Sequence, residues 1–336
     1  MTPTAFLDSL GRPLGDLRVS VTDRCNFRCR YCMPRERFGK DHAFLPRAEL
    51  LTFEEVTRVV GVLGSGLRKV RLTGGEPLLR KDLAELVGQL RRAGSPPVAL
   101  TTNGVLLPQF AEALAQAGLA RLTVSLDALD PQVFAAVTDA DYGADDVLAG
   151  IDSAVEAGFT RLKINCVVRR GLNESEILPL ARRFHGSGHV LRFIEYMDVG
   201  STNGWRTEQV MSAAEIVALI DRELPLEAID RALPNDVASR YRYRDGGGEI
   251  GVIASMTQPF CGDCSRLRLS ADGQLYTCLF ATTGTDLRGP LRADASDTQL
   301  AALVRRLWEN RADRYSEQRQ QLVMPKRKLE MSYLGG

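Results

Sequence analysis

Along the first two-thirds of the chain, short runs rich in Val, Ile, Leu and Thr alternate with longer segments in which apolar residues recur at helical spacing. The short runs predict β-strands, because branched aliphatic side chains fit the pleated surface of a buried sheet. Six strands are expected, over Arg18–Thr22, Lys69–Thr73, Val98–Thr102, Arg121–Ser125, Leu162–Val168 and Val190–Tyr196.

Helix signals lie between these strands. Thr52 precedes an apolar pattern that begins at Val56, and Glu55 stands three residues after it, which is the arrangement of a capping box. Further helices are expected over Lys81–Ala93, Gln109–Ala117, Ala144–Ala157 and Glu174–Phe184. Strand–helix units in series predict an α/β fold with a parallel sheet, whose ligand site lies at the carboxyl ends of the strands.

Six units are too few for the closed eightfold barrel, so an open barrel and a doubly wound sheet both fit this pattern. The alternation breaks near Pro225–Pro234, and beyond it we expect a short strand at Ile250–Ser255 and a helix at Asp297–Asn310. The break predicts two regions, residues 1–225 and residues 226–336.

Composition narrows the classes of function. Of the 336 residues, 44% are hydrophobic and 25% are charged, as in an ordinary globular protein, and the net charge of +1 gives no general signal for nucleic acid. An anionic ligand would therefore need local basic groups. The chain starts without an apolar run, and its longest apolar stretches are far shorter than the roughly 20 residues needed to span a bilayer. We therefore expect a cytoplasmic protein with no membrane contact.

Six of the seven cysteines fall in two tight groups. Cys25, Cys29 and Cys32 form the first, Cys261, Cys264 and Cys278 form the second, and Cys166 stands alone in a predicted strand. In a reducing cytosol such groups bind metal more often than they form disulfides. Cys166 is expected to be a buried strand residue.

The first group has the spacing C-x3-C-x2-C and directly follows the first predicted strand. A four-iron cluster normally takes four thiolates, so three in one loop leave one iron open to a small molecule. A zinc site is the alternative, although it needs a fourth ligand, and the nearest histidine, His42, lies ten residues past Cys32. Spacing alone leaves both open.

The second group has a C-x2-C pair, and Cys278 follows after thirteen more residues. A zinc-ribbon fragment is again the alternative, but no fourth cysteine or nearby histidine completes it. Arg266 and Arg268 follow at alternate positions, so on a strand both side chains point to one face and can clamp a phosphate.

The run from Cys25 to Cys32 resembles the signature of the radical S-adenosylmethionine (SAM) superfamily. The resemblance implies that Cys25, Cys29 and Cys32 hold a 4Fe–4S cluster whose fourth iron is chelated by SAM. Electron transfer then cleaves SAM to a 5′-deoxyadenosyl radical. The segment Thr73–Pro77 is similar to the part of these enzymes that contacts the methionine amino group. By this resemblance the SAM contacts are Tyr31, Gly75, Glu76, Ser125 and Met197.

Over nearly its whole length the chain also resembles the GTP 3′,8-cyclase family. The segments that match include Ser20–Cys29, Thr101–Gly104, Val124–Ala128, Arg192–Gly200 and the region from Cys261 to Phe280. This resemblance implies an incomplete (β/α)6 TIM-like barrel in residues 1–225. It implies an extension in residues 226–336 with a second 4Fe–4S cluster on Cys261, Cys264 and Cys278.

The implied reaction converts GTP to (8S)-3′,8-cyclo-7,8-dihydroguanosine 5′-triphosphate, the first step of molybdenum cofactor biosynthesis. The radical removes the hydrogen at the ribose 3′ carbon, and Arg266 and Arg268 act in catalysis with the first three cysteines. Residues implied to contact GTP are Arg18, Arg71, Thr101, Lys163, Arg192, Arg266 and Arg268. The tail, Gly335–Gly336, is implied to reach the active site.

The family also implies partners: an external electron donor and a downstream cyclic pyranopterin monophosphate synthase. No nucleic acid or membrane is expected, and a monomer and a homodimer both remain open. Two other functions are considered. One is a peptide-modifying radical SAM enzyme with an auxiliary cluster, and the other is a non-enzymatic zinc-binding module.

Overall fold

The computed structural model of the chain describes residues 6–231, 236–319 and 328–335. Its strands are β1 (Asp16–Ser20), β2 (Lys69–Thr73), β3 (Val98–Thr102), β4 (Arg121–Ser125), β5 (Lys163–Val168), β6 (Val190–Glu195), β7 (Leu226–Ile229), β8 (Ser239–Tyr243), β9 (Glu249–Ile253), β10 (Arg266–Leu269), β11 (Gln274–Tyr276) and β12 (Thr285–Asp286). Its α-helices are α1 (Phe53–Leu63), α2 (Leu83–Arg92), α3 (Leu107–Ala117), α4 (Pro131–Thr138), α5 (Ala144–Glu156), α6 (Ile177–Phe184), α7 (Ala213–Asp221), α8 (Arg288–Arg292), α9 (Asp297–Glu309), α10 (Tyr315–Gln318) and α11 (Met331–Leu334). Short 3-10 helices are η1 (Arg47–Glu49), η2 (Gly64–Gly66), η3 (Pro77–Leu79), η4 (Glu174–Glu176), η5 (Thr207–Gln209) and η6 (Cys261–Asp263).

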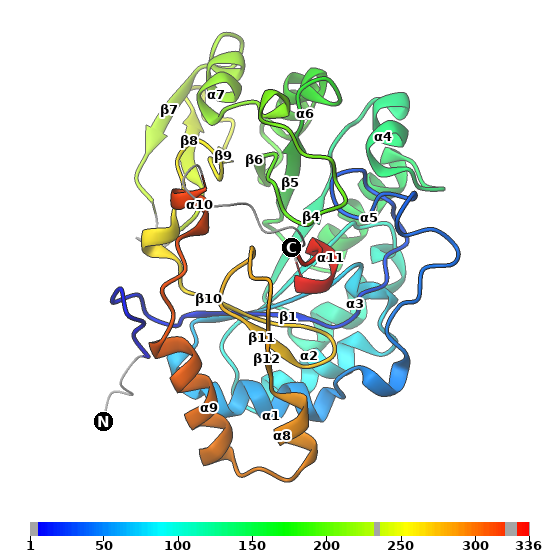
Figure 1. Cartoon of the computed structure of the whole chain (residues 1–336). Helices are drawn as coiled ribbons and strands as arrows, with labels where there is room; N and C mark the ends of the chain where they lie inside the picture. The colour runs from blue at the N-terminus through cyan, green and yellow to red at the C-terminus, as the bar shows by residue number, and fades with distance from the viewer. Residues whose placement is uncertain (1–5, 232–235, 320–327, 336) are drawn as a thin grey trace.

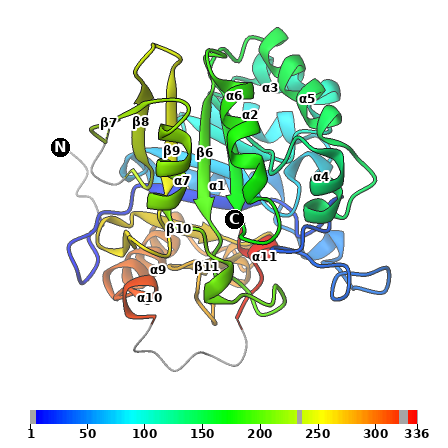
Figure 2. The same ribbon diagram turned by 90° about the horizontal axis from the view of Figure 1, so that it is seen from above.

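All these strands belong to one curled sheet, in the order β12-β11-β10-β1-β2-β3-β4-β5-β6-β9-β8-β7 (Figure 1). The six predicted strands are confirmed as β1 to β6, and they pair in sequence as parallel neighbours. Of the two arrangements that the sequence leaves open, the protein adopts the open barrel. Helices α1, α2, α3, α5 and α6 cover its outer face, as Figures 1 and 2 show.

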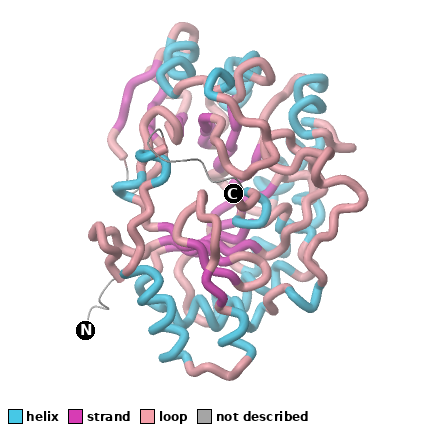
Figure 3. The backbone as a smooth tube through the Cα atoms, viewed as in Figure 1, coloured by secondary structure: helices cyan, strands magenta, loops and turns pink. Residues whose placement is uncertain are grey.

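The C-terminal region extends this sheet at both ends. Strand β10 pairs in parallel with β1, and β9 pairs in parallel with β6. Antiparallel neighbours then follow at each edge, β11 and β12 beside β10, and β8 and β7 beside β9. The strand expected at Ile250–Ser255 is confirmed as β9. Figure 3 shows the strands gathered in the interior with helices around them.

Alternation along the strands separates the hydrophobic core from the inner face of the barrel. Leu17 and Val19 on β1 are fully buried in the core, as are Val70 and Leu72 on β2. Side chains alternate across a sheet, so Arg18, between Leu17 and Val19, and Arg71, between Val70 and Leu72, face the opposite side. The cavity lies on that side. The inner face can therefore carry polar groups without disturbing the core.

The helix predictions hold with small changes. Thr52 caps α1 through the predicted capping box with Glu55. Helix α3 begins at Leu107, two residues early, because Pro108 lies in its first turn, where no amide donor is needed. The segment Glu174–Phe184 is divided into η4 and α6. Within the described residues, no helix is long and apolar enough to cross a membrane.

Candidate active site

A cavity of about 1140 Å³ opens on the inner face of the sheet. Every predicted site residue lines it: Arg18, Cys25, Cys29, Tyr31, Cys32, Arg71, Gly75, Glu76, Thr101, Ser125, Lys163, Arg192, Met197, Cys261, Cys264, Arg266, Arg268 and Cys278. Residues as far apart in the sequence as Arg18 and Cys278 therefore line the same cavity. Cys166 does not line it; this residue is fully buried in β5, as predicted.

The first cysteine group lies in the loop that follows β1. Cys25, Cys29 and Cys32 are half-buried, and the amide of Phe27 donates to Cys25 Sγ at 3.4 Å. Burial, together with the charge of Glu76, raises the pKa of the Cys25 thiol to about 12. Burial likewise raises the pKa of Cys29 and of Cys32. A bound cation would reverse this effect by favouring the thiolates.

The two glycines after β2 pack directly against the cysteine loop. An added Cβ at Gly74 would lie 2.3 Å from the carbonyl oxygen of Thr22, and one at Gly75 would lie 2.3 Å from that of Arg24. The amide of Gly75 donates to the Thr22 carbonyl at 2.9 Å. The glycines therefore permit a close approach of backbone to backbone.

Glu76 is buried beside this contact and accepts several hydrogen bonds. Its carboxylate receives the hydroxyl of Thr102 at 2.7 Å and the amide of Asn103 at 2.7 Å. Burial outweighs these bonds and raises the pKa of Glu76 to about 7. Tyr31, which lines the same cavity, donates its hydroxyl to Asp127 at 2.6 Å. Both predicted SAM contacts are thus held in fixed orientations.

The second cysteine group lines the same cavity near β10, the strand that neighbours β1. Cys261 begins η6 and Cys264 follows it, and Arg266 Nη2 lies 3.4 Å from Cys264 Sγ. Burial opposes ionisation of Cys264, but the charges of Arg266 and Arg311 prevail and lower its pKa to about 6. Burial raises the pKa of Cys278 to about 11. The basic neighbours favour an anionic ligand set here.

Basic side chains from neighbouring strands form a row on the inner face. Arg268, Arg18 and Arg71 stand at matching positions on β10, β1 and β2. Burial, followed by repulsion from the other arginines, lowers the pKa of Arg18. The same causes lower the pKa of Lys163 to about 8 and that of Arg192 to about 9. Half-buried and buried cations that repel one another create a site for a polyanion.

Polar neighbours orient this row. Arg71 donates to the hydroxyl of Thr101 at 2.6 Å, and Arg192 donates to Asn165 Oδ1 at 2.7 Å. The sequence reasoning missed Lys69 and Asp16, which also line the cavity and form an ion pair at 2.9 Å. Each stands two residues before a predicted arginine on the same strand, so the alternation rule that joined Arg266 to Arg268 would have found both.

The C-terminal tail (residues 328–335) lies over the inner face, and α11 is near the middle of the molecule in both views (Figures 1 and 2). Arg268 donates to the carbonyl of Leu334 at 3.4 Å and to that of Gly335. Gly335 has a φ of 71°, and an added Cβ would lie 2.4 Å from Thr73 Cγ2. Gly336 lies outside the described residues.

The donor set of each cysteine group fits a four-iron cluster. Each group offers three half-buried cysteines that line the cavity. In such a cluster each thiolate binds a different iron, and three protein thiolates leave the fourth iron open to a small molecule.

Two family profiles together cover most of the chain. The profile of the Radical SAM superfamily matches residues 19–184, and that of Molybdenum Cofactor Synthesis C matches residues 189–317. A GTP 3′,8-cyclase from Acidothermus cellulolyticus is 53% identical over 98% of both chains. The enzymes of the same name from Xanthomonas campestris pv. campestris and Staphylococcus carnosus are 50% and 45% identical, each over 98% of this chain and at least 97% of the relative.

Solved structures resemble this fold at low sequence identity. Streptococcus suis SuiB, crystallised with SAM, matches with a TM-score of 0.62 and 14% identity over 88% of this chain and 68% of SuiB. SuiB bound to its precursor peptide SuiA matches with a TM-score of 0.59 and 15% identity, over 88% of this chain and 67% of that one. These similarities support the architecture alone.

Proposed function

The chain belongs to the GTP 3′,8-cyclase family, and from this premise we propose that its cavity binds SAM and GTP side by side. The enzyme converts GTP to (8S)-3′,8-cyclo-7,8-dihydroguanosine 5′-triphosphate, the first step of molybdenum cofactor biosynthesis. Its cofactors are two 4Fe–4S clusters and SAM. One observation supports the arrangement above all: two three-cysteine groups and a row of cations line the same cavity.

Cys25, Cys29 and Cys32 would hold the first cluster, and SAM would bind beside it. We assign the SAM contacts to Tyr31, Gly75, Glu76, Ser125 and Met197. Support comes from their common position on the cavity wall and from the hydrogen bonds that orient Tyr31 and Glu76. When bound, cluster and SAM supply a 5′-deoxyadenosyl radical, which removes the hydrogen at the ribose 3′ carbon before that carbon bonds to guanine C8.

Cys261, Cys264 and Cys278 would hold the second cluster, close to the base of GTP. We assign the triphosphate and ribose contacts to Arg18, Arg71, Thr101, Lys163, Arg192, Arg266 and Arg268. A triphosphate supplies the negative charge that this row of cations lacks, and guanidinium groups bind phosphate oxygens in pairs. Holding the ribose and the guanine in one conformation would bring the 3′ carbon and C8 into bonding range.

We further propose a division of labour within the single sheet. Residues 1–225 would form the partial barrel that initiates the reaction, and residues 226–336 would hold the second cluster and contribute Arg266 and Arg268 to the GTP site. The C-terminal tail would reach the active site, and the bond from Arg268 to the Gly335 carbonyl supports this. The protein would act in the cytoplasm as a monomer or a homodimer, without nucleic acid or membrane. It would draw electrons from an external donor and pass its product to cyclic pyranopterin monophosphate synthase.

Anaerobic turnover of the reconstituted protein tests this function. With GTP, SAM and dithionite, we expect 5′-deoxyadenosine and cyclised nucleotide in equal amounts. GTP labelled with deuterium at the ribose 3′ carbon should pass that deuterium to the deoxyadenosine. Deoxyadenosine formed while GTP remains intact would exclude GTP as the substrate and favour a peptide. Protein that binds zinc without iron or sulfide would exclude radical chemistry altogether.

A further inference from the structure

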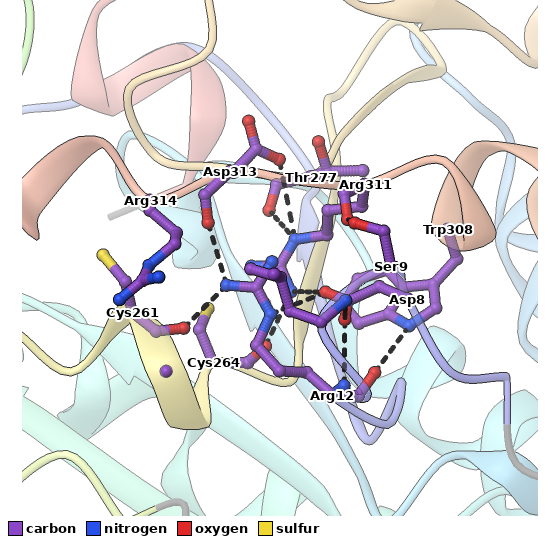
Figure 4. Close-up of polar contacts among 12 residues, drawn as sticks. Asp8, Ser9, Arg12, Cys261, Cys264, Thr277, Trp308, Arg311, Asp313 and Arg314 are labelled. Atoms are coloured by element: carbon purple, nitrogen blue, oxygen red, sulfur yellow. Dashed lines mark hydrogen bonds and ion pairs between the residues drawn. The ribbon is translucent and has the colours of Figure 1, made fainter. Parts of the chain in front are cut away.

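Two buried arginines lie beside the second cysteine group, Arg12 next to the carbonyl of Cys261 and Arg311 next to that of Cys264 (Figure 4). The side chains of Arg12 and Arg311 are 3% and 1% exposed, and that of Asp8 between them is fully buried. Asp8 Oδ2 accepts hydrogen bonds from Arg12 Nε at 2.6 Å and from Arg311 Nη1 at 3.0 Å. One carboxylate therefore bridges two guanidinium groups.

Both guanidinium groups also reach the backbone that carries the cysteines. Arg12 Nη1 donates to the carbonyl of Cys261 at 2.7 Å, and Arg311 Nη1 donates to that of Cys264 at 2.7 Å. Arg311 Nε donates at 3.0 Å to the carbonyl of Thr277, the residue before Cys278. A buried arginine thus holds each cysteine in place. It binds the cysteine's own carbonyl for Cys261 and Cys264, and the carbonyl of the preceding residue for Cys278.

Additional bonds fix the arginines themselves. Trp308 on α9 donates its indole N–H to the carbonyl of Arg12 at 3.1 Å, and Ser9 donates its hydroxyl to the carbonyl of Arg311 at 2.6 Å. Residues from the N-terminal segment and from the end of α9 therefore meet at the second cysteine group. The loop that bears these cysteines cannot move without breaking contacts to both.

A second carboxylate borders this network. Asp313 Oδ2 lies 3.6 Å from Arg311 Nε, and Arg12 Nη1 donates to the carbonyl of Asp313 at 2.8 Å. The side chain of Asp313 is 34% exposed, so water screens its charge, whereas Asp8 and both arginines are shielded from water. The buried part of the network therefore holds two guanidinium groups and one carboxylate, and three thiolates on a cluster would supply further negative charge beside it.

We propose that Asp8, Arg12 and Arg311 are positioning residues for the second cluster. They hold Cys261, Cys264 and Cys278 in cluster-binding geometry and stabilise the negative charge of the ligand set. This inference rests on the proposed function, in which those three cysteines bind a 4Fe–4S cluster.

Iron content of the full-length, anaerobically reconstituted protein gives the first test. The wild type should hold about eight irons per chain, as two four-iron clusters require. Arg12→Met and Arg311→Met should lose about half of the iron and sulfide, yet keep the first cluster and its reductive cleavage of SAM. Ser9→Ala is the matched control, because it removes a bond of the same network that touches no cysteine segment, and it should keep all of the iron.

The midpoint potential of the second cluster tests the charge, measured by spectroscopic titration with Cys25, Cys29 and Cys32 all replaced by Ala. Asp8→Asn removes a negative charge and should raise the potential, whereas Arg12→Gln removes a positive charge and should lower it. A purely structural role would not produce shifts of opposite sign. If the Met variants do not fold, these two potentials decide the matter.

Two results separate the inference from its premise. Full iron content and unchanged potentials in Arg12→Gln and Arg311→Gln would overturn the positioning role while leaving the second cluster intact. A wild-type protein that holds only about four irons would instead refute the second cluster, and with it the proposed function.

Discussion

Lys328 places its ammonium 2.8 Å from Asp198 Oδ2, and both side chains are buried. Tyr315 donates its hydroxyl to the same oxygen at 2.7 Å. Burial opposes the charge of Asp198, but these two donors prevail and hold its pKa below the ordinary range. Glu330, two residues on, accepts the amide of Ser201 at 3.0 Å. The loop after β6 therefore anchors the C-terminal tail that reaches Arg268.

Asp198→Asn should release this tail. Removing one partner of a buried ion pair leaves the other charge uncompensated, which costs about 3–5 kcal/mol. We expect faster cleavage of the C-terminal segment in limited proteolysis and a loss of GTP turnover with iron content retained. Glu85→Gln breaks an exposed pair with Arg92 and is the control, with an expected change below about 1 kcal/mol in unfolding free energy. Proteolysis at the wild-type rate would contradict the anchoring role.

Gly75→Ala should disrupt the first cluster. The new Cβ would lie 2.3 Å from the Arg24 carbonyl, so the cysteine loop would have to move. We expect loss of the iron bound by Cys25, Cys29 and Cys32, measured by iron analysis and by SAM cleavage. Gly61→Ala is the matched control. Gly61 lies in α1, and a Cβ added there would meet nothing within 4 Å beyond the helix's own backbone. The substitution should stabilise the protein by about 0.5–1 kcal/mol. Full iron in both variants would show that the loop tolerates the shift.

Local patterns predicted much of this fold. The strands β1 to β6 are short and aliphatic, and once they are assigned, alternation alone places Arg18 and Arg71 on the inner face. Helices α4 and α7 were not predicted, although their signals are local. Asp130 caps α4 and Pro131 follows it, and Ser212 forms a capping box with Glu215 at the start of α7. These two omissions were avoidable.

Other features depend on contacts that no local pattern encodes. The pairing of β10 with β1 joins residues about 250 positions apart, and so does the bond from Arg12 to Cys261. Family resemblance supplied the candidate ligands of the site, since spacing alone left zinc open. The buried triad of Asp8, Arg12 and Arg311 has no motif, because each member is an ordinary charged residue until folding brings the three together.

Arg266→Ala should weaken GTP binding. Arg266 lies on the cavity wall beside Cys264, and a charged hydrogen bond contributes about 1.5–3 kcal/mol, which corresponds to a roughly ten- to hundredfold rise in Kd. Calorimetry on the reconstituted protein measures this change. Arg242→Ala, which removes an exposed partner of Glu227, should leave the Kd unaltered. Equal affinities in all three proteins would remove Arg266 from the GTP site.

The lowered pKa of Lys163 predicts opposite effects of pH on the stability of the protein and on its affinity for GTP. Burial and the nearby arginines lower its pKa from 10.5 to about 8, so between these values the unfolded chain binds more protons than the folded protein. The contribution of Lys163 to stability therefore rises with pH across that range. GTP favours the charged ammonium, so its affinity should fall as pH rises above about 8. Calorimetry at pH 7 to 9 should show this decline in the wild type and a weaker, flatter profile in Lys163→Met. Parallel profiles in the two proteins would show that another group governs the pH dependence.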